Sequence, residues 1–538
     1  MNKRYALIIV LAILWLCPPA PWAKSGEKAA GAWQITGNSA THFRWQGTDG
    51  EAPGTATSDG ETFREELSVY MARQLPDNHR LGLDFRARVT NDERLDDETF
   101  RLLYLRGYWD AKTHRTNVGD VAASFNPYVF STALKGAKLE FSPYRRKGFQ
   151  AAVVGGVQKA SWQEVFSKVT NEQPDRWLGG VNTSYTFDAG QKVGLTLALV
   201  RDRINTGDVT RVQADGAYAA NAGLETEWRF NRYLTLRSQA AFMEGTDNLR
   251  EDQGYSNGHA IKVRLLTKPL PRSLRSNFTY EYVDPDFAPL VGSGAANRER
   301  IENDTSYHFN RQLKFRLTLK HSRDNLDHAN ADTQYINDGN FYCDYRPDFI
   351  KRGDIGLRLQ TKSIDGNGVE QLQYEGETQI NVRPKSGWRL GGAYIYSLLD
   401  DDAAGAGDQQ IHTLRSTLGW KKKLGKESRF RATVKLDYRL VDETAADQSK
   451  LGGGLDLGWD YNPYWSFDLA LRSHTTERDN ADDTGYGNYQ FRADFHPWKD
   501  RTKTLRLLAE QRDYRSDSTT TDQTYKENIV EMSYIFSF

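Results

Sequence analysis

Cysteine is almost absent from this chain. Its 538 residues include two, Cys17 and Cys343, and Cys17 falls within an N-terminal segment that we expect to be removed. The single remaining thiol excludes an internal disulfide and a cysteine metal cluster. The sequence also contains no C-x-x-C-H motif for attaching c-type haem, so we expect no cofactor in this chain.

Long apolar runs and an excess of one charge are also missing. Beyond residue 24, no run approaches the roughly 18 apolar residues that a membrane-spanning helix needs. Lys and Arg together number 71, as do Asp and Glu, so no net field favours nucleic acid as a partner. A membrane protein is still compatible with this composition, because the strands of a transmembrane barrel alternate lipid-facing apolar residues with lumen-facing polar ones.

The first residues follow the pattern of a secretory signal. Lys3 and Arg4 supply positive charge, residues 5–16 form an apolar core, and Pro21-Trp22-Ala23 is a plausible cleavage region. The sequence therefore predicts a signal peptide at 1–23 and one barrel domain at 24–538.

The rest of the chain shows alternation with a period of two, which is the period of a β-strand. In 311–321 the apolar and polar positions separate onto opposite faces: Leu313, Phe315, Leu317 and Leu319 against Lys314, Arg316, Thr318 and Lys320. Segments 80–89, 429–440, 465–472 and 489–496 repeat the pattern. These segments are predicted to be strands with one apolar face.

The connections between these strands alternate in length. Very short turns, such as 77–78, 231–232 and 462–463, are followed by longer polar loops, such as 91–99, 244–258 and 477–487. Bacterial outer-membrane barrels have this asymmetry, with short periplasmic turns and long extracellular loops.

Counting the alternating segments gives about 26 strands, within a range of 22 to 28. The predicted fold is all-β: a single large closed antiparallel transmembrane β-barrel with short periplasmic turns and long extracellular loops. Closure is required because an open strand edge in hydrocarbon leaves backbone groups without partners. We therefore expect the first strand, near 33–45, to pair with the last, 525–538.

The chain ends on a strand of distinctive composition. Alternate positions up to the final residue are large and apolar: Val530, Met532, Tyr534, Phe536 and Phe538. This ending resembles the C-terminal signal strand of bacterial outer-membrane β-barrels. The resemblance implies recognition by the barrel-assembly machinery, and it implies a location in the lipid of a Gram-negative outer membrane after secretion.

Charged residues of both signs occupy the face opposite the apolar one, and these are the candidate lumen-lining residues. They are Glu225, Glu227, Arg229, Lys314, Arg316, Lys320, Arg431, Lys435, Asp437, Arg472, Arg492 and Asp494. Such a wall can hydrate a channel or dock a polar partner, and the sequence leaves both open. One loop, 125–134, is unusually apolar; it is expected either to fold into the lumen or rim, or to extend a pair of strands.

Size limits the function. Strands about 4.8 Å apart and tilted about 40° give a 26-strand ring a diameter of roughly 50 Å. Barrels of 16–18 strands already hold an aqueous channel, so something should fill this lumen. The leading hypothesis is a channel or sheath that holds a partner. The alternatives are a general or substrate-selective diffusion porin narrowed by its own loops, with anions or sugars as candidate substrates, and a barrel for polysaccharide export.

A second resemblance bears on the partner. The repeated sequences 322–325 (S-R-D-N) and 477–480 (E-R-D-N), together with the strand number, resemble MtrB/PioB-type porins of porin–cytochrome conduits. The resemblance implies a multihaem c-type cytochrome in the lumen or periplasm as a partner. The scattered histidines form no Ser/His/Asp-type constellation, so we expect the chain not to be an enzyme.

Overall fold

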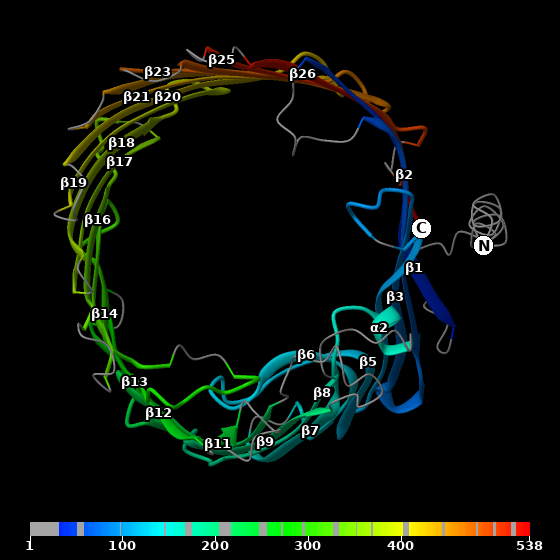
Figure 1. Ribbon diagram of the computed structural model, residues 1–538, viewed down its shortest axis with the longest axis vertical. Helices are drawn as coiled ribbons and strands as arrows, with labels where there is room; N and C mark the ends of the chain where they lie inside the picture. The colour runs from blue at the N-terminus through cyan, green and yellow to red at the C-terminus, as the bar shows by residue number, and fades with distance from the viewer. Residues whose placement is uncertain are drawn as a thin grey trace, which may run out of the picture.

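The chain forms a single closed ring of strands. In the computed structural model, 26 antiparallel β-strands make up one sheet (Figure 1). The structure describes residues 32–50, 59–96, 98–144, 147–166, 175–203, 217–246, 256–270, 273–292, 296–326, 333–350, 352–366, 369–401, 408–443, 447–479, 483–498, 502–517 and 523–538. The signal peptide predicted at 1–23 lies outside them.

The elements follow one another along the chain with few interruptions. The first half contains β1 (Trp33–Gly50), β2 (Gly60–Gln74), η1 (Pro76–Asn78), β3 (Arg80–Thr90), β4 (Phe100–Asp110), β5 (His114–Ser124), β6 (Ser131–Phe141), β7 (Gly148–Gln158), α2 (Trp162–Phe166), β8 (Asp175–Thr186), β9 (Lys192–Arg203), β10 (Tyr218–Arg229), β11 (Leu234–Thr246), β12 (Ser256–Leu270) and β13 (Leu274–Val283). The second half contains β14 (Arg298–His308), β15 (Leu313–Asp324), β16 (Tyr335–Tyr345), β17 (Gly353–Gly366), β18 (Val369–Val382), β19 (Trp388–Asp401), β20 (Gln409–Lys423), β21 (Arg429–Glu443), β22 (Gln448–Asp460), β23 (Trp465–Arg478), β24 (Asp483–Phe495), β25 (Lys503–Asp517) and β26 (Gln523–Ser537).

Each strand pairs with its neighbours in the sequence, and β1 pairs with β26 to close the ring. The closing ladder runs from Asn38 opposite Ser537 to Gly50 opposite Tyr525. The predicted strand number, antiparallel pairing and closure are therefore confirmed. In the described part of the chain, no helix is long and apolar enough to cross a membrane.

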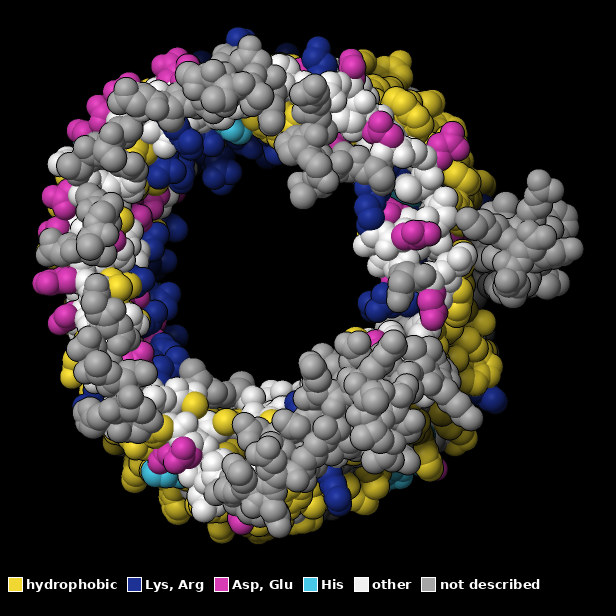
Figure 2. All heavy atoms as spheres, viewed as in Figure 1, with side chains coloured by type: hydrophobic (Ala, Val, Ile, Leu, Met, Phe, Trp, Pro, Cys, Tyr) yellow, Lys and Arg dark blue, Asp and Glu magenta, His cyan; other side chains and the backbone are white. Residues whose placement is uncertain are grey.

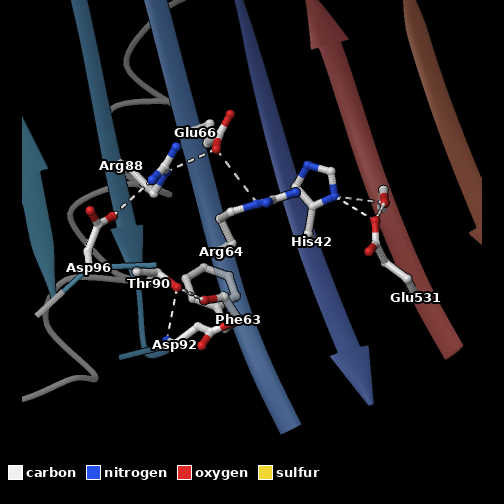
Figure 3. A network of polar contacts seen from close by, with 10 residues as sticks. His42, Phe63, Arg64, Glu66, Arg88, Thr90, Asp92, Asp96 and Glu531 are labelled. Atoms are coloured by element: carbon white, nitrogen blue, oxygen red, sulfur yellow. Dashed lines mark hydrogen bonds and ion pairs between the residues drawn. The ribbon is translucent and has the colours of Figure 1, made fainter. Parts of the chain in front are cut away.

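Polar side chains on the inner face tie the two ends together. His42 of β1 and Glu531 of β26 lie 2.9 Å apart, and Ser533 donates a hydrogen bond to the same carboxylate (Figure 3). Beside them, Glu66 of β2 pairs with Arg88 of β3 at 3.0 Å. At the chain terminus, the backbone groups of Gly37 and Phe538 exchange two hydrogen bonds of 2.8 and 3.0 Å.

The outer face is apolar and the inner face is charged. On β9, for example, Leu195, Leu197 and Leu199 are exposed on the outer face, whereas an apolar cluster in a soluble protein would be buried. Figure 2 shows hydrophobic side chains along the outside of the ring beside β9–β12, and Lys and Arg side chains along the inside beside β14–β20. The alternation read from the sequence thus becomes two surfaces of opposite polarity.

Aromatic side chains gather on the outer face next to the short turns. They are exposed to different degrees and come from several strands: Trp228, Phe230, Phe309, Trp459, Tyr461, Tyr464, Trp465 and Trp498. Amphipathic rings of this kind favour the level of lipid headgroups. Cys343 is a free thiol on the outer face of β16.

Closure of the barrel depends on the absence of a side chain at Gly37, and this can be tested. A side chain there would meet the carbonyl oxygen of Ser68 and lie 2.7 Å from the ring of Phe538. Gly37→Leu should therefore disturb the β1–β26 contact and lower stability by about 1–3 kcal/mol, the usual cost of overpacking. The measurement is the thermal midpoint of the purified barrel in detergent. Gly425→Leu is the control, because nothing lies within 4 Å of a Cβ at that turn position; equal midpoints for the two variants would contradict this account.

Candidate functional site: the inner wall and its inward hairpin

All the candidate lumen-lining residues lie on described strands, at positions that alternate with exposed apolar residues of the outer face. On β10, Glu225 and Glu227 flank the outward Thr226, and Leu224 and Trp228 on the outer face are exposed. On β21, Arg431, Lys435 and Asp437 alternate with Val434, Leu436 and Tyr438, which are exposed. Since successive side chains point to opposite faces of a strand, the candidates face the interior of the ring.

Several of these candidates form two ion-pair networks across β21–β24. Asp468 accepts hydrogen bonds from Arg431, at 2.6 Å, and from Arg492. Asp456 pairs with Lys435 at 2.9 Å and with Arg472 at 3.7 Å. Each carboxylate therefore balances two cations from other strands.

The same pattern recurs around the wall. Glu227 pairs with Arg229 at 2.6 Å and with Arg237 at 3.0 Å, and Glu225 accepts a hydrogen bond from Gln239. Arg316 pairs with Asp304, and Lys320 lies 3.6 Å from Asp338. Asp494 binds Arg506 at 2.8 Å. In the described part of the chain, Lys314 and Asp437 make no ion pair. Most of these candidates thus have a partner within the wall itself.

One pair of strands leaves the wall and folds inward. The ladder between β4 and β5 includes only Arg106–Asp110 and Arg115–Gly119, and the ladder between β6 and β7 begins at Lys135. β5 and β6 nevertheless stay paired up to Ser124 and Ser131. Residues 120–134 therefore project from the wall as a hairpin, here called the lumen hairpin, which is visible inside the ring in Figure 1.

The lumen hairpin corrects the sequence interpretation of 125–134 as a single loop. Residues 125–130 form the turn, with Phe125 N–H donating to Phe130 O at 2.9 Å, while residues 131–134 belong to β6. Both alternatives weighed from the sequence hold in part, because the strand pair extends beyond the wall and also bends into the lumen.

The tip of the lumen hairpin packs against the inner wall. Val129 and Phe130 are 0% exposed. They join an apolar cluster from the inner face of β7–β13 and the loop that follows: Val154, Leu178, Ala198, Val200, Ala219, Ala241, Met243, Ala260, Val283, Phe287 and Val291. Small residues permit the approach, since a Cβ at Gly223 would lie 2.5 Å from Val129. The hairpin therefore covers this part of the inner wall.

Polar contacts fix the hairpin at its tip and at its base. At the tip, Tyr128 donates a hydrogen bond to Glu281 of β13, and Ser131 N–H donates to Val291 O at 2.8 Å. Burial, and then the hydrogen bond to Glu281, raise the pKa of Tyr128. At the base, Asp120 accepts hydrogen bonds from Leu105 N–H at 2.6 Å and from Trp162 of α2 at 2.7 Å.

A recess of about 590 Å³ lies beside the base of the hairpin, on the inner face of β2–β6. Tyr70 and Tyr108 stack there with their ring centroids 6.4 Å apart, and the Arg80 guanidinium lies 5.6 Å from the Tyr70 ring. Arg106 of the same recess pairs with Asp84. Arg80 covers a tyrosine ring and Asp84 pairs with Arg106, so these polar groups of the recess have their partners within the wall.

Sequence analysis missed the surface on which the hairpin docks. The signal was present on β9, where Leu195, Leu197 and Leu199 of the outer face are interleaved with Ala198 and Val200 of the inner face. A wall strand that is apolar on both faces is expected to be covered on both. Within the described residues, no group of three or more His, Cys, Asp and Glu could hold a metal ion.

Comparisons with known proteins identify no family. No protein-family model matches the chain, and no curated protein does. Among solved structures, the P pilus usher (PapC) translocation pore is 11% identical, with 94% of this chain and 100% of that chain covered and a TM-score of 0.36. The siderophore receptor PirA from Pseudomonas aeruginosa is 11% identical, with 94% and 80% covered and a TM-score of 0.37.

A third solved structure is Wzi, an outer-membrane protein from Escherichia coli described as a carbohydrate-binding β-barrel involved in group 1 capsule assembly. It is 9% identical, with 61% of this chain and 80% of that chain covered and a TM-score of 0.32. Similarity at these levels carries no argument about activity. The class of this protein, a closed 26-strand antiparallel β-barrel, rests on its own strand pairing.

The packing of the hairpin predicts the effect of a larger residue at Gly223. Gly223→Leu should push Val129 off the wall and expose the aromatic residues at 125, 128 and 130 to chymotrypsin, whereas the native barrel should resist cleavage there. The fragments can be identified by mass spectrometry. Gly194→Leu is the matched control on β9, because a Cβ at Gly194 meets its nearest atom at 3.4 Å. If both variants resist cleavage, the hairpin does not depend on close contact with Gly223.

The raised pKa of Tyr128 predicts that docking of the lumen hairpin depends on pH. Because its folded pKa is raised, the docked state holds the phenol proton more tightly, so docking stability is complete below the ordinary tyrosine pKa of about 10 and falls as the pH rises above it. Amide protection of 125–131 should fall by up to about tenfold per pH unit above pH 10. Hydrogen–deuterium exchange corrected for intrinsic rates measures this, and Tyr128→Phe should abolish the dependence. If amide protection falls at alkaline pH to the same extent in Tyr128→Phe, the pH dependence belongs to another group.

Proposed function

We propose that this protein is a transmembrane channel of a Gram-negative outer membrane and that its lumen holds a partner protein. The first part of the proposal is supported by the closed ring with its apolar outer face and charged inner face. In hydrocarbon, every backbone polar group needs an internal partner, and a closed ladder provides it. The aromatic side chains beside the short turns fit the headgroup level at one membrane boundary.

The width of the lumen carries the second part of the proposal. A ring of 26 strands is roughly 50 Å across. The lumen hairpin covers the wall only from β7 to β13, and an opening through the ring remains in Figures 1 and 2. An unfilled pore of this width would admit most periplasmic and external solutes. A partner that fills the opening removes this leak.

The specific candidate for the partner is a multihaem c-type cytochrome, for which the barrel would act as an insulating sheath. This candidate comes from the resemblance of the sequence to MtrB/PioB-type porins. The wall itself would supply hydration, docking and electrical insulation, with no chemistry of its own.

A second function, a diffusion channel, is favoured by the lumen hairpin. An inward element fixed at both tip and base narrows the opening permanently, as a selective pore requires. In that case the chain alone would be sufficient for function, and the opening beside the hairpin would be the solute path.

A pull-down and a conductance measurement decide between the two functions. The tagged chain is purified from detergent-solubilised native outer membrane; the partner proposal expects a stoichiometric second protein, which haem staining would identify as a cytochrome. The chain purified alone should then form a large and poorly selective pore in a planar bilayer. A small, ion-selective conductance with no co-purifying protein would contradict the partner proposal and favour the diffusion channel. Absence of any membrane insertion would overturn both functions.

A further inference from the structure

A set of cations gathers at one end of the lumen. At the short-turn ends of β17–β21, six Lys and Arg residues lie at inner-face positions or in the turns between them, and all are exposed: Arg352, Arg383, Arg389, Lys421, Lys423 and Arg429. In the described part of the chain, none of their side chains forms an ion pair or hydrogen bond. We call this set the basic mouth. Three of its members line a pocket of about 350 Å³ together with Arg346.

The strand register brings like charges face to face within the basic mouth. Lys421 is directly opposite Arg431, and Lys423 is directly opposite Arg429. Like charges at directly opposed positions are destabilising. Two carboxylates lie nearby without forming an ion pair with these cations: Asp354, which lines the same pocket and accepts a hydrogen bond from Asn381 at 3.1 Å, and Asp460, which is opposite Arg429 in the register.

Elsewhere this chain neutralises the same kind of pair. Arg88 and Arg101 are also opposite one another on β3 and β4. There the buried carboxylate of Asp96 lies between them, at 3.1 Å from Arg88 and 2.7 Å from Arg101 (Figure 3 shows the contact with Arg88). Arg431, which is opposite Lys421, is likewise held by Asp468. Among the described residues of the basic mouth, no carboxylate bridges Lys423 and Arg429 in this way.

We propose that the basic mouth binds an acidic convex surface of the protein that occupies the lumen. This inference rests on the function proposed above and adds the site and charge of the contact. An acidic surface of another protein would supply to these cations the negative charge that Asp96 and Asp468 supply to arginines elsewhere on the wall. The inner-face position of Arg389, Lys421, Lys423 and Arg429 separates them from lipid headgroups, which surround the outside of the ring.

The extent of the basic mouth favours a protein surface over a small anion. With strands about 4.8 Å apart and tilted about 40°, the arc from β17 to β21 spans roughly 25–30 Å. A folded domain of about 100 residues has a radius of gyration near 13 Å, so it is roughly 34 Å across. Such a domain fits a lumen about 50 Å wide at the backbone once side chains take about 5 Å from each wall. A single small anion would neutralise only the arginines of the pocket.

The test uses a defined acidic probe and the full-length barrel. Fluorescein-labelled hexaglutamate is titrated with the protein in a nonionic detergent, and anisotropy reports binding. Binding to the native barrel should weaken at least tenfold in the triple variant Lys421→Gln, Lys423→Gln, Arg429→Gln. It should also weaken strongly between 0.1 and 1 M salt, because the Debye length falls from about 10 to 3 Å.

The matched control removes three other inner-face cations from β20–β22: Arg415→Gln, Arg439→Gln, Lys450→Gln. These also form no ion pair in the described part of the chain, and they lie about 20 Å or more along the strands from the three residues changed in the test variant. The control should change hexaglutamate affinity by less than twofold. Gel mobility of the folded barrel before and after heating verifies that both variants fold.

Two results would overturn the inference: no hexaglutamate binding by the native barrel, or equal weakening in the test and control variants. The pull-down of the previous section separates this failure from failure of the proposed function. If a stoichiometric partner co-purifies equally with the native chain and the triple variant at 0.15 M salt, the lumen holds a partner but the basic mouth does not bind it. If hexaglutamate binds at the basic mouth but no partner is found, the proposed sheath function fails and the site is an anion-binding site of a channel.

Discussion

Backbone hydrogen bonding is the constraint on which the rest of this structure depends. A strand edge has no partner in hydrocarbon, so the sheet must close on itself. The ladder between β1 and β26, with the Gly37–Phe538 pair at its end, provides that closure. Closure fixes an inside and an outside, and the period-two alternation then assigns apolar side chains to one surface and charges to the other.

The number of strands makes the closed ring wide. A ring this wide cannot be filled by the side chains of its own wall, as a small barrel is. The chain fills one sector with the lumen hairpin, and Asp120 and Tyr128 secure the hairpin at its base and tip. The lumen is therefore asymmetric: the hairpin covers part of the inner wall along β7–β13, whereas an opening remains beside it.

Many charges on the inner wall are paired in the described part of the chain. Carboxylates such as Asp468, Asp456 and Asp96 each serve two cations from different strands. This arrangement lowers the cost of placing many charges on one concave surface. At the basic mouth, Lys423 faces Arg429 without such a carboxylate, so an acidic surface bound there would relieve their repulsion.

The sequence by itself determined the strands, their approximate number and the two faces of the ring. The alternation in 311–321 and the apolar alternate positions up to Phe538 were sufficient to predict strands, because the periodicity of a strand is local. Closure was predictable because a strand edge in hydrocarbon lacks hydrogen-bond partners. The apolar character of 125–134 was also visible. The surface on which this segment docks was not visible in the sequence, because Gly223 and Phe287 meet the hairpin only when distant strands are brought together. Ion-pair partners such as Arg431 and Asp468 were likewise decided by tertiary structure, since strand register sets which side chains are neighbours.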